Sequence, residues 1–209
     1  MLRTETHRDA LGHWPPAGRH ILAQFDADSI VVYQAYNEEI AAAAVADGRL
    51  GGGGFSLNRM SWIKPNFLWM MYRSGWATKP HQERLLAIRI PRARFVDLLD
   101  AAVHSSFSAS TVEDEPTWRA AVATSDVRLQ WDPDHAPDGT PQARRAVQLG
   151  LRGEILRRFA VEWPIEILDV TAFVREQRAH IGTPTLLVPT ERVFALPQET
   201  ARRIGLDRQ

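Results

Sequence analysis

Residues 55–79, FSLNRMSWIKPNFLWMMYRSGWATK, form the stretch around which the rest of the chain is predicted to fold. The stretch holds three of the seven tryptophans, three of the four methionines and both lysines, while the other basic residues of the chain are 23 arginines. A lysine ends in a compact ammonium that meets a phosphate as a point charge, whereas arginine is a planar fork. The clustering of Lys64 and Lys79 therefore indicates a role specific to lysine, with chance clustering as the alternative.

Pro65 interrupts this stretch, because proline lacks the amide hydrogen that a continuing helix needs. We expect a boundary near Lys64 and then a helix or a strand over residues 66–72. The three tryptophans recur every seven residues, which is more typical of a buried helical face than of a platform for stacking bases.

The composition is that of a globular protein without cysteine chemistry. The 209 residues are 44% hydrophobic and 24% charged and include no cysteine, which excludes disulfides, thiolate zinc sites and cysteine nucleophiles. No apolar run is typical of a signal peptide or a membrane span, so we expect a cytoplasmic protein with no membrane contact. The segment HWPPAG predicts a loose leader over residues 1–18, followed by a single α+β domain over residues 19–209.

The net charge is zero, but the charges are unevenly distributed along the chain. Residues 55–94 carry eight basic side chains and one acidic side chain, a net charge of +7, whereas residues 95–134 carry two basic and eight acidic side chains, a net charge of −6. Such segregation can focus a positive field on an anionic ligand. The alternative is that the two segments are neighbours and neutralise each other.

Short strands are predicted to alternate irregularly with helices, which favours an α+β fold over a doubly wound sheet. Asn37 is a plausible N-cap and Gly48 a plausible end for one of these helices. Strands are predicted at residues 21–25, 30–36, 83–90, 127–131, 146–151 and 163–170, and helices at residues 38–47, 92–104, 116–122, 153–159, 171–179 and 198–204.

Several familiar site types lack support in the sequence. The four glycines at residues 51–54 are not followed by the Gly-Lys-Ser/Thr of a phosphate loop, so we interpret them as a flexible connector. The seven histidines show no metal-ligand spacing, and no Gly-x-Ser-x-Gly elbow occurs, so neither a metal site nor a hydrolase triad is expected.

Two family resemblances rest on longer motifs. The first is carried by VYQAYN, FSLNRMSWIKPNFLWMMYRSGW, QERLLAI, RLQWDP and AVQLGL. With these motifs the chain from about His20 onward resembles the domain of unknown function 4291 family. The second is carried by the order of VYQAYN, IAAAAVADGRL, NFLWMMYRSGWA, RLLAIRI and RRAVQLGL along the chain. More weakly, this order is similar to that of ADP-ribosyltransferases, closest to those that modify DNA bases.

The second resemblance implies a split, mainly antiparallel sheet, flanked by short helices, that clasps NAD. In that superfamily a His or Arg on the first strand holds the ribose, a second strand supports the nicotinamide and a late acidic residue orients the sugar. The corresponding positions here are Gln34, the pair Arg73 and Ser74, and Gln148. Since an amide lacks the charge of a carboxylate, Glu154 is the residue that would substitute for a late acid.

The residues themselves suggest the same region. Arg73 follows an apolar run and can pair with a phosphate, the alternative being a salt bridge to an acid of residues 95–134. Alternation places Gln34 and Tyr36 on one face of a strand and Tyr33 on the other, and an inward polar group needs a partner; the alternative is an exposed edge strand. The catalytic candidates are Gln34, Arg73, Gln148 and Glu154, and the cofactor-binding candidates are Tyr33, Tyr36, Asn37, Arg59, Trp62, Lys64 and Ser74.

Two functional hypotheses follow. The first is an ADP-ribosyltransferase-like enzyme that binds NAD or a related nucleotide and modifies an acceptor such as DNA or RNA, given the basic segment. The second is a non-catalytic module that binds a nucleotide or a nucleic acid through the same basic, aromatic surface. A third possibility is that the aromatic stretch is simply core.

Overall fold

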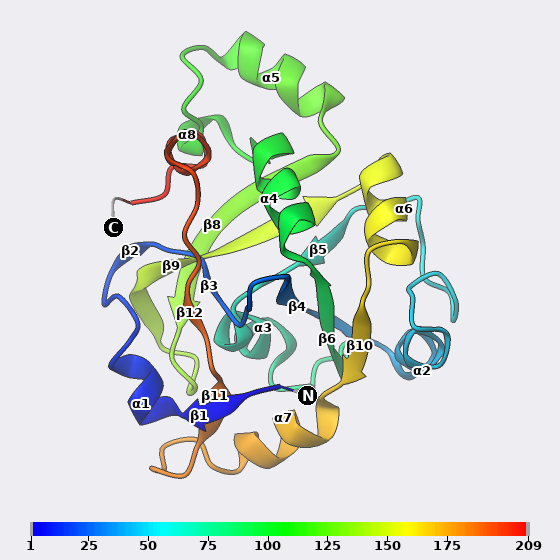
Figure 1. The fold of residues 1–209 in the computed structure, drawn as a ribbon, viewed down its shortest axis with the longest axis vertical. Helices are drawn as coiled ribbons and strands as arrows, with labels where there is room; N and C mark the ends of the chain where they lie inside the picture. The colour runs from blue at the N-terminus through cyan, green and yellow to red at the C-terminus, as the bar shows by residue number, and fades with distance from the viewer. Residues whose placement is uncertain (1, 208–209) are drawn as a thin grey trace.

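The computed structural model describes residues 2–207 as an α+β fold with mainly antiparallel sheets (Figure 1). The α+β prediction is thus confirmed, and residues 208–209 of the predicted domain lie outside the described residues. The helices are α1 (His7–Leu11), α2 (Glu38–Asp47), α3 (Phe67–Ser74), α4 (Arg92–Ala101), η1 (Phe107–Ala109), α5 (Glu115–Thr124), α6 (Gly153–Val161), α7 (Thr171–Arg178) and α8 (Gln198–Arg203). The strands are β1 (Thr4–Thr6), β2 (Gly18–Arg19), β3 (Leu22–Ala23), β4 (Ser29–Tyr36), β5 (Ser61–Ile63), β6 (Arg84–Pro91), β7 (Val103–His104), β8 (Val127–His135), β9 (Pro141–Leu151), β10 (Glu166–Asp169), β11 (Leu187–Pro189) and β12 (Arg192–Val193).

Two larger sheets carry most of the strands. The first has the order β10-β6-β4 and is antiparallel throughout. The second has the order β2-β9-β8-β7, with β5 added antiparallel to β9. An isolated bridge between Tyr33 and Lys64 joins the edge strand β4 to the end of β5, so the two sheets meet beside the segment that connects β5 to α3.

Strand β4 is buried on both faces, although it lies at the edge of its sheet. Ile30 and Val32 belong to one hydrophobic cluster, whereas Val31 and Tyr33 belong to a second cluster on the opposite face. Because side chains of a strand alternate between faces, Gln34 follows Val32 and points between the two sheets. The alternative of an exposed edge strand is wrong, since Gln34 is only 3% exposed.

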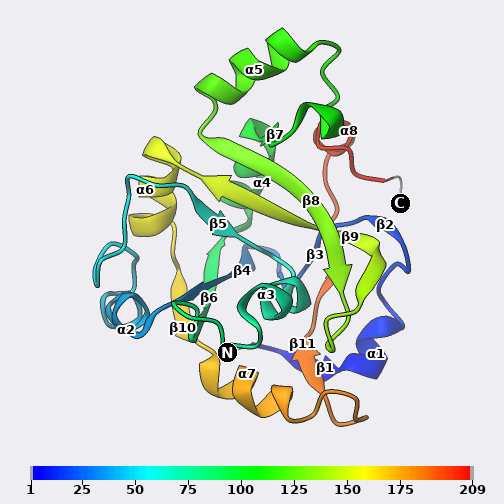
Figure 2. The same ribbon diagram turned by 180° about the vertical axis from the view of Figure 1, so that it is seen from behind.

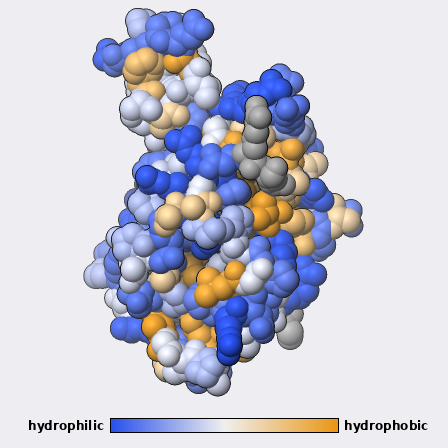
Figure 3. Space-filling view, turned by 90° about the vertical axis from the view of Figure 1, so that its left-hand side faces the viewer, coloured by the Kyte–Doolittle hydropathy of each residue, from blue (hydrophilic) through white to orange (hydrophobic). Residues whose placement is uncertain are grey.

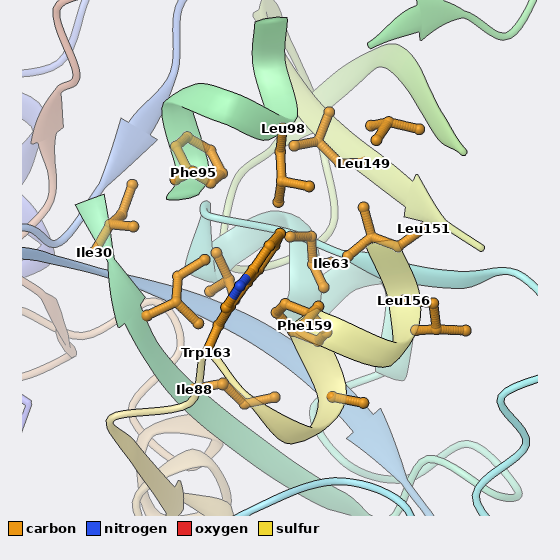
Figure 4. Packing of buried hydrophobic residues seen from close by; sticks show 14 of the residues in the cluster. Ile30, Ile63, Ile88, Phe95, Leu98, Leu149, Leu151, Leu156, Phe159 and Trp163 are labelled. Carbon is orange, nitrogen blue, oxygen red and sulfur yellow. The ribbon is translucent and has the colours of Figure 1, made fainter. Parts of the chain in front are cut away.

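The first cluster fills the space between the two sheets and is closed by α4 and α6. Figure 4 shows Trp163 at its centre, with Ile88 from β6, Leu149 and Leu151 from β9 and Phe159 from α6 around it. Burying such aliphatic and aromatic side chains contributes about 1.5–3 kcal/mol each. This core fixes β4, β5 and β9 relative to one another.

The central stretch forms a strand, a turn and a helix. After β5, Asn66 caps α3 by accepting a hydrogen bond from the Trp69 amide at 2.7 Å. The helix ends at Gly75, whose φ of 60° is a conformation that favours glycine. Helix α3 packs against β4 and β8 (Figure 2). The residues predicted as helix or strand are therefore helix, and the pair Arg73 and Ser74 closes that helix rather than lying on a strand.

The N-terminal segment is ordered within the described residues, which corrects the prediction of a loose leader. Strand β1 pairs with β11, and Thr6 caps α1. Trp14 is only 6% exposed and its Nε1 donates to the Glu191 carbonyl at 3.1 Å. These partners lie late in the chain, so the local sequence carries no sign of them.

Helix α5 projects from the body beyond α4 and α8 (Figure 1), and the same projection stands at the top of the space-filling view in Figure 3. None of its residues is buried. Over residues 2–207 no helix has the length and apolar character needed to cross a membrane.

Candidate functional site

A cleft of about 640 Å³ opens where β4 faces β5 and the β8–β9 pair. Its walls combine side chains from both sheets with the end of α3 and the loop before β6. The lining residues are Gln34, Ala35, Tyr36, Asn37, Ile40, Arg59, Met60, Ser61, Trp62, Lys64, Met70, Arg73, His81, Gln82, Gln130 and Gln148.

Gln34 contributes a buried acceptor that has no partner. Its Nε2 donates to Ser61 Oγ at 2.8 Å and to the Trp62 carbonyl at 3.1 Å. A carbonyl only accepts hydrogen bonds, so the amide nitrogen of Gln34 is the end that faces Trp62. The amide oxygen is buried without a hydrogen-bond partner among residues 2–207, and it is therefore available to a donor on a ligand.

Tyr36, Ser61 and Trp62 form an aromatic and hydroxyl-bearing wall. The Tyr36 hydroxyl lies 3.4 Å from Ser61 Oγ, and burial raises the pKa of Tyr36, which keeps its hydroxyl neutral. Trp62 pairs with Gly150 of β9, where an added Cβ would lie 2.9 Å from the indole ring. A glycine at this position thus lets the indole lie across β9 beside the cleft.

Asp132 is held by two glutamine side chains at the cleft wall. Its Oδ1 accepts from Gln130 Nε2 at 2.8 Å and its Oδ2 accepts from Gln148 Nε2 at 2.7 Å. Gln130 and Gln148 are directly paired across β8 and β9, so both reach the same carboxylate. The amides orient the carboxylate and leave its negative charge in place.

Lys64 is the buried cation of the cleft. The residue is 4% exposed, and its Nζ has no hydrogen bond or ion pair among residues 2–207. Burial, followed by the positive charge of Arg73, lowers the pKa of Lys64 to about 8, against a smaller opposing effect of Asp132. With this pKa about a tenth of the Lys64 amine is neutral at pH 7 and about half at pH 8.

Arg59 and Arg73 add exposed positive charge at the cleft. Arg73 closes α3 and donates to Gln82 Oε1 at 3.3 Å. Neither arginine lies within ion-pair distance of a carboxylate in the described part of the chain. The alternative that Arg73 pairs with an acid of residues 95–134 is thus wrong.

Within residues 2–207, three other cations of the basic segment form ion pairs, two of them with acids outside residues 95–134. Arg84 pairs with Glu38 and Asp169, and Arg89 with Asp26 and Glu166. The pair between Arg94 and Asp97 does join the two charged segments. Mutual neutralisation therefore describes one end of the basic segment, while the cations at the cleft lack such partners.

The loop beside the cleft contains strained backbone. Trp76, Ala77 and His81 have φ values of 56°, 63° and 62°, in the left-handed region that non-glycine residues rarely adopt. Such conformations cost about 1–3 kcal/mol each and cluster at functional sites. Of the three, His81 lines the cleft, whereas Trp76 and Ala77 are buried.

Eight of the predicted site residues come together at the cleft. They include the capping residue Asn37, whose Oδ1 is engaged by the Ile40 amide at 3.0 Å. The eight are Gln34, Tyr36, Asn37, Arg59, Trp62, Lys64, Arg73 and Gln148.

Three predicted site residues do not line the cleft. Tyr33 points to the opposite face of β4 and contacts Phe67 edge-on. Ser74 is fully buried and donates to the Met70 carbonyl at 2.9 Å. Glu154 lies on the exposed side of α6, where it pairs with Arg157 and Arg158.

Sequence reasoning missed the carboxylate that is bound by the cleft residues Gln130 and Gln148. Gln130 lies on the strand predicted over residues 127–131 and Asp132 follows directly after that strand, but the partner Gln148 follows only from the register of β8 and β9. Ser61, His81 and Gln82 carried no recognisable pattern. Within residues 2–207, no three His, Asp or Glu side chains come together as a metal site.

The fold is α+β, and the cleft between its two larger sheets is basic and rich in side-chain amides. The chain belongs to the family described as "Domain of unknown function (DUF4291)", whose model matches residues 20–194. This match confirms the first family resemblance. A search of curated proteins finds no significant match.

Proposed function

We propose that this protein is an ADP-ribosyltransferase-like enzyme that binds NAD or a related nucleotide in the cleft. The observation that carries the proposal is the set of three cleft cations, Arg59, Lys64 and Arg73, which have no carboxylate within ion-pair distance among residues 2–207. Unpaired positive charge in a cleft attracts an anionic ligand. The diphosphate group of NAD or a related nucleotide supplies the matching negative charge.

The other walls suit the remaining parts of a dinucleotide. The free amide oxygen of Gln34 can accept from a ribose hydroxyl. Trp62 and Tyr36 offer aromatic surfaces for a base or a nicotinamide ring. Arg59 and Arg73 are exposed and can meet phosphate oxygens, with Lys64 adding positive charge deeper in the cleft.

Asp132 supplies a carboxylate in place of the acid that the resemblance expects at position 148. When the bond between nicotinamide and ribose breaks, nicotinamide leaves with the bonding electrons and positive charge develops on the sugar. A fixed negative charge nearby stabilises that state. Asp132 is oriented by Gln148 at 2.7 Å, so we assign to Asp132 the stabilising role and to Gln148 the positioning role.

One observation favours a second candidate, a nucleotide- or nucleic-acid-binding module without catalysis. The strand positions where the resemblance expects a His or Arg and a Glu are occupied by Gln34 and Gln148, both of which are neutral. A binder needs no charge at either position. The acceptor in the first candidate and the ligand in the second both include DNA or RNA.

Thermal unfolding with added ligands tests the proposal. A ligand that binds only the folded state stabilises the protein by about 2.7 kcal/mol at 100 times its Kd. We expect NAD and ADP-ribose to raise the Tm of the wild type and not of Arg73→Ala. Stabilisation by short oligonucleotides alone supports the second candidate, and no response to any of these ligands contradicts both.

Nicotinamide release then separates an enzyme from a binder. Wild-type protein is expected to release nicotinamide from NAD, and Asp132→Asn to release it about 10²–10³ times more slowly. Asp132→Asn keeps the size of the side chain, so its Tm serves as the control for folding. Binding of NAD without any release by the wild type contradicts the catalytic part of the proposal.

A further inference from the structure

Lys64 differs from an ordinary phosphate-binding lysine in where its amine lies. The side chain is almost entirely buried, lines the cleft and has no hydrogen-bond or ion-pair partner among residues 2–207. A permanently charged ammonium in such a place is costly. Burial and the nearby guanidinium of Arg73 both favour the neutral amine, as the lowered pKa of about 8 indicates. These are the two means by which proteins make a lysine nucleophilic.

Lys79 is a natural comparison, because the chain has only these two lysines. Lys79 is exposed, and its Nζ donates to the carbonyls of Tyr72 at 3.2 Å and Arg73 at 2.9 Å. It also lies 5.6 Å from the centre of the Tyr72 ring. Carbonyl oxygens and an aromatic face are both groups that bind an ammonium. The same residue type thus has opposite environments at two points of one segment.

We propose that Lys64 is a covalent nucleophile that forms an imine with the aldehyde or ketone carbon of a phosphorylated sugar. The free sugar carbon of ADP-ribose, in its open aldehyde form, is one such group. The proposal rests on the proposed function only for the phosphate-bearing ligand. It goes further by assigning a bond-forming role to a residue that the nucleotide-binding account treats as a charge.

The step balances without any further reactant. Nζ attacks the carbonyl carbon, and one amine hydrogen moves to the carbonyl oxygen to give a carbinolamine. The oxygen then leaves as water with the second amine hydrogen, and a C=N bond remains. No electron donor or acceptor is needed. Asp132 is the carboxylate whose charge acts on Lys64, and a carboxylate can relay these protons.

The surroundings of Lys64 select the ligand class. Arg59 and Arg73 supply the phosphate contacts, and the unpartnered oxygen of Gln34 accepts from a sugar hydroxyl. An aldehyde without phosphate would lack the first of these interactions. The cleft therefore favours a phosphorylated sugar over a simple aldehyde.

Reductive trapping tests the proposal. The full-length protein is incubated near neutral pH with ribose 5-phosphate, ADP-ribose or unphosphorylated ribose in sodium cyanoborohydride, which reduces an imine to a stable secondary amine. Intact mass and peptide mapping locate the adduct. We expect Lys64 to be labelled about tenfold or more faster than Lys79, since each unit of lowered pKa raises the neutral fraction about tenfold. The phosphorylated sugars are expected to label Lys64 faster than ribose.

Variants separate the outcomes. Lys64→Met preserves the size of the side chain and is expected to abolish the main adduct, whereas Lys79→Met is expected to retain it. Equal labelling of both lysines, or labelling of Lys64 no faster than that of Lys79, overturns the inference. If ADP-ribose raises the Tm but no adduct forms at Lys64, the imine is disproved and the nucleotide site stands. If Lys64 is labelled equally by ribose and the phosphorylated sugars, the phosphate selection is disproved.

Discussion

Two aspartates on β8, two residues apart, have opposite surroundings. Asp134 is 1% exposed and pairs with Arg144, whose Nε lies 2.8 Å and Nη2 2.6 Å from Asp134 Oδ2. Asp132 is held by amides of Gln130 and Gln148, and it acts on Lys64 without forming an ion pair. The first carboxylate is neutralised by its partner, whereas the second keeps its charge beside unpaired cations.

The difference separates a region in which charges form ion pairs, around Asp134, from a region in which they do not, at the cleft. Arg144 also donates to the Pro15 carbonyl at 2.7 Å and lies 5.2 Å from the centre of the Trp14 ring, so the Asp134 pair ties the N-terminal segment to β9. At the cleft, the protein keeps Lys64, Arg59 and Arg73 unpaired among the described residues. The Asp134 and Arg144 pair therefore stabilises the fold, whereas the three cleft cations are the ones we propose to bind a ligand.

The largest expected effect is at the paired aspartate. Arg144→Met removes one partner of a buried ion pair and leaves Asp134 charged and buried, which costs about 3–5 kcal/mol of folding free energy. Urea unfolding monitored by circular dichroism measures the change. The double variant Asp134→Asn with Arg144→Met is expected to recover part of that loss, and a single variant as stable as the wild type contradicts the assigned role of the pair.

The second effect concerns Lys64 and depends on pH. Its pKa is about 8 in the folded protein and about 10.4 in an unfolded chain. Between these values the unfolded state binds more protons, so the stability of the wild type rises with pH across this window, by up to about 3 kcal/mol. Below about pH 8 both states are protonated and the cost is fully present.

Lys64→Met removes this titration. We expect the variant to equal or exceed the wild type in stability near pH 7, with the difference shrinking as pH approaches about 10. Urea unfolding at several pH values measures it, and Lys79→Met controls for loss of an exposed lysine. A difference between Lys64→Met and wild type that does not change with pH contradicts the lowered pKa of the buried Lys64 amine.

A third effect concerns the hydrogen bonds that Asp132 accepts from the side-chain amides of Gln130 and Gln148. Gln148→Glu replaces the donor that lies 2.7 Å from Asp132 Oδ2 by a second carboxylate, so we expect a loss of about 2 kcal/mol at neutral pH. The repulsion raises the pKa of the new acid, and the loss should diminish on acidification as one carboxyl is protonated. Gln148→Ala removes the donor without adding charge, so it should lose less folding free energy than Gln148→Glu. A larger loss in Gln148→Ala would contradict the hydrogen bond assigned between Gln148 and Asp132.

The smallest stability effect is expected at the unpaired arginine. Arg73 is exposed and makes one hydrogen bond of 3.3 Å to Gln82, so Arg73→Ala should change the folding free energy by only about 0.5 kcal/mol. Thermal unfolding without ligand checks this value. A loss of folding free energy comparable to that of Arg144→Met would show that Arg73 stabilises the fold. It would then contradict the difference between the Asp134 pair and the cleft cations.

Much of the frame of the cleft could be predicted from the sequence. Asn37 and Gly48 bound α2 as capping residues should, and alternation along β4 correctly separated Gln34 from Tyr33. Asp132 was missed because its contact with Gln148 depends on the register between β8 and β9, which no local pattern encodes. The burial of Trp14 likewise depends on Glu191 and Arg144, far along the chain. Local patterns thus predicted the helix caps and the strand faces, whereas contacts between residues far apart in the chain could not be predicted from them.

Binding of ADP-ribose, measured by isothermal titration calorimetry, tests the central claim most directly. We predict that the wild type binds ADP-ribose with a measurable Kd. Arg73→Ala should bind about tenfold or more weakly, because a charge-assisted contact of about 1.5 kcal/mol is lost. Lys79→Ala should bind like the wild type. Absence of binding by the wild type, or equal affinity of the wild type and Arg73→Ala, would contradict that claim.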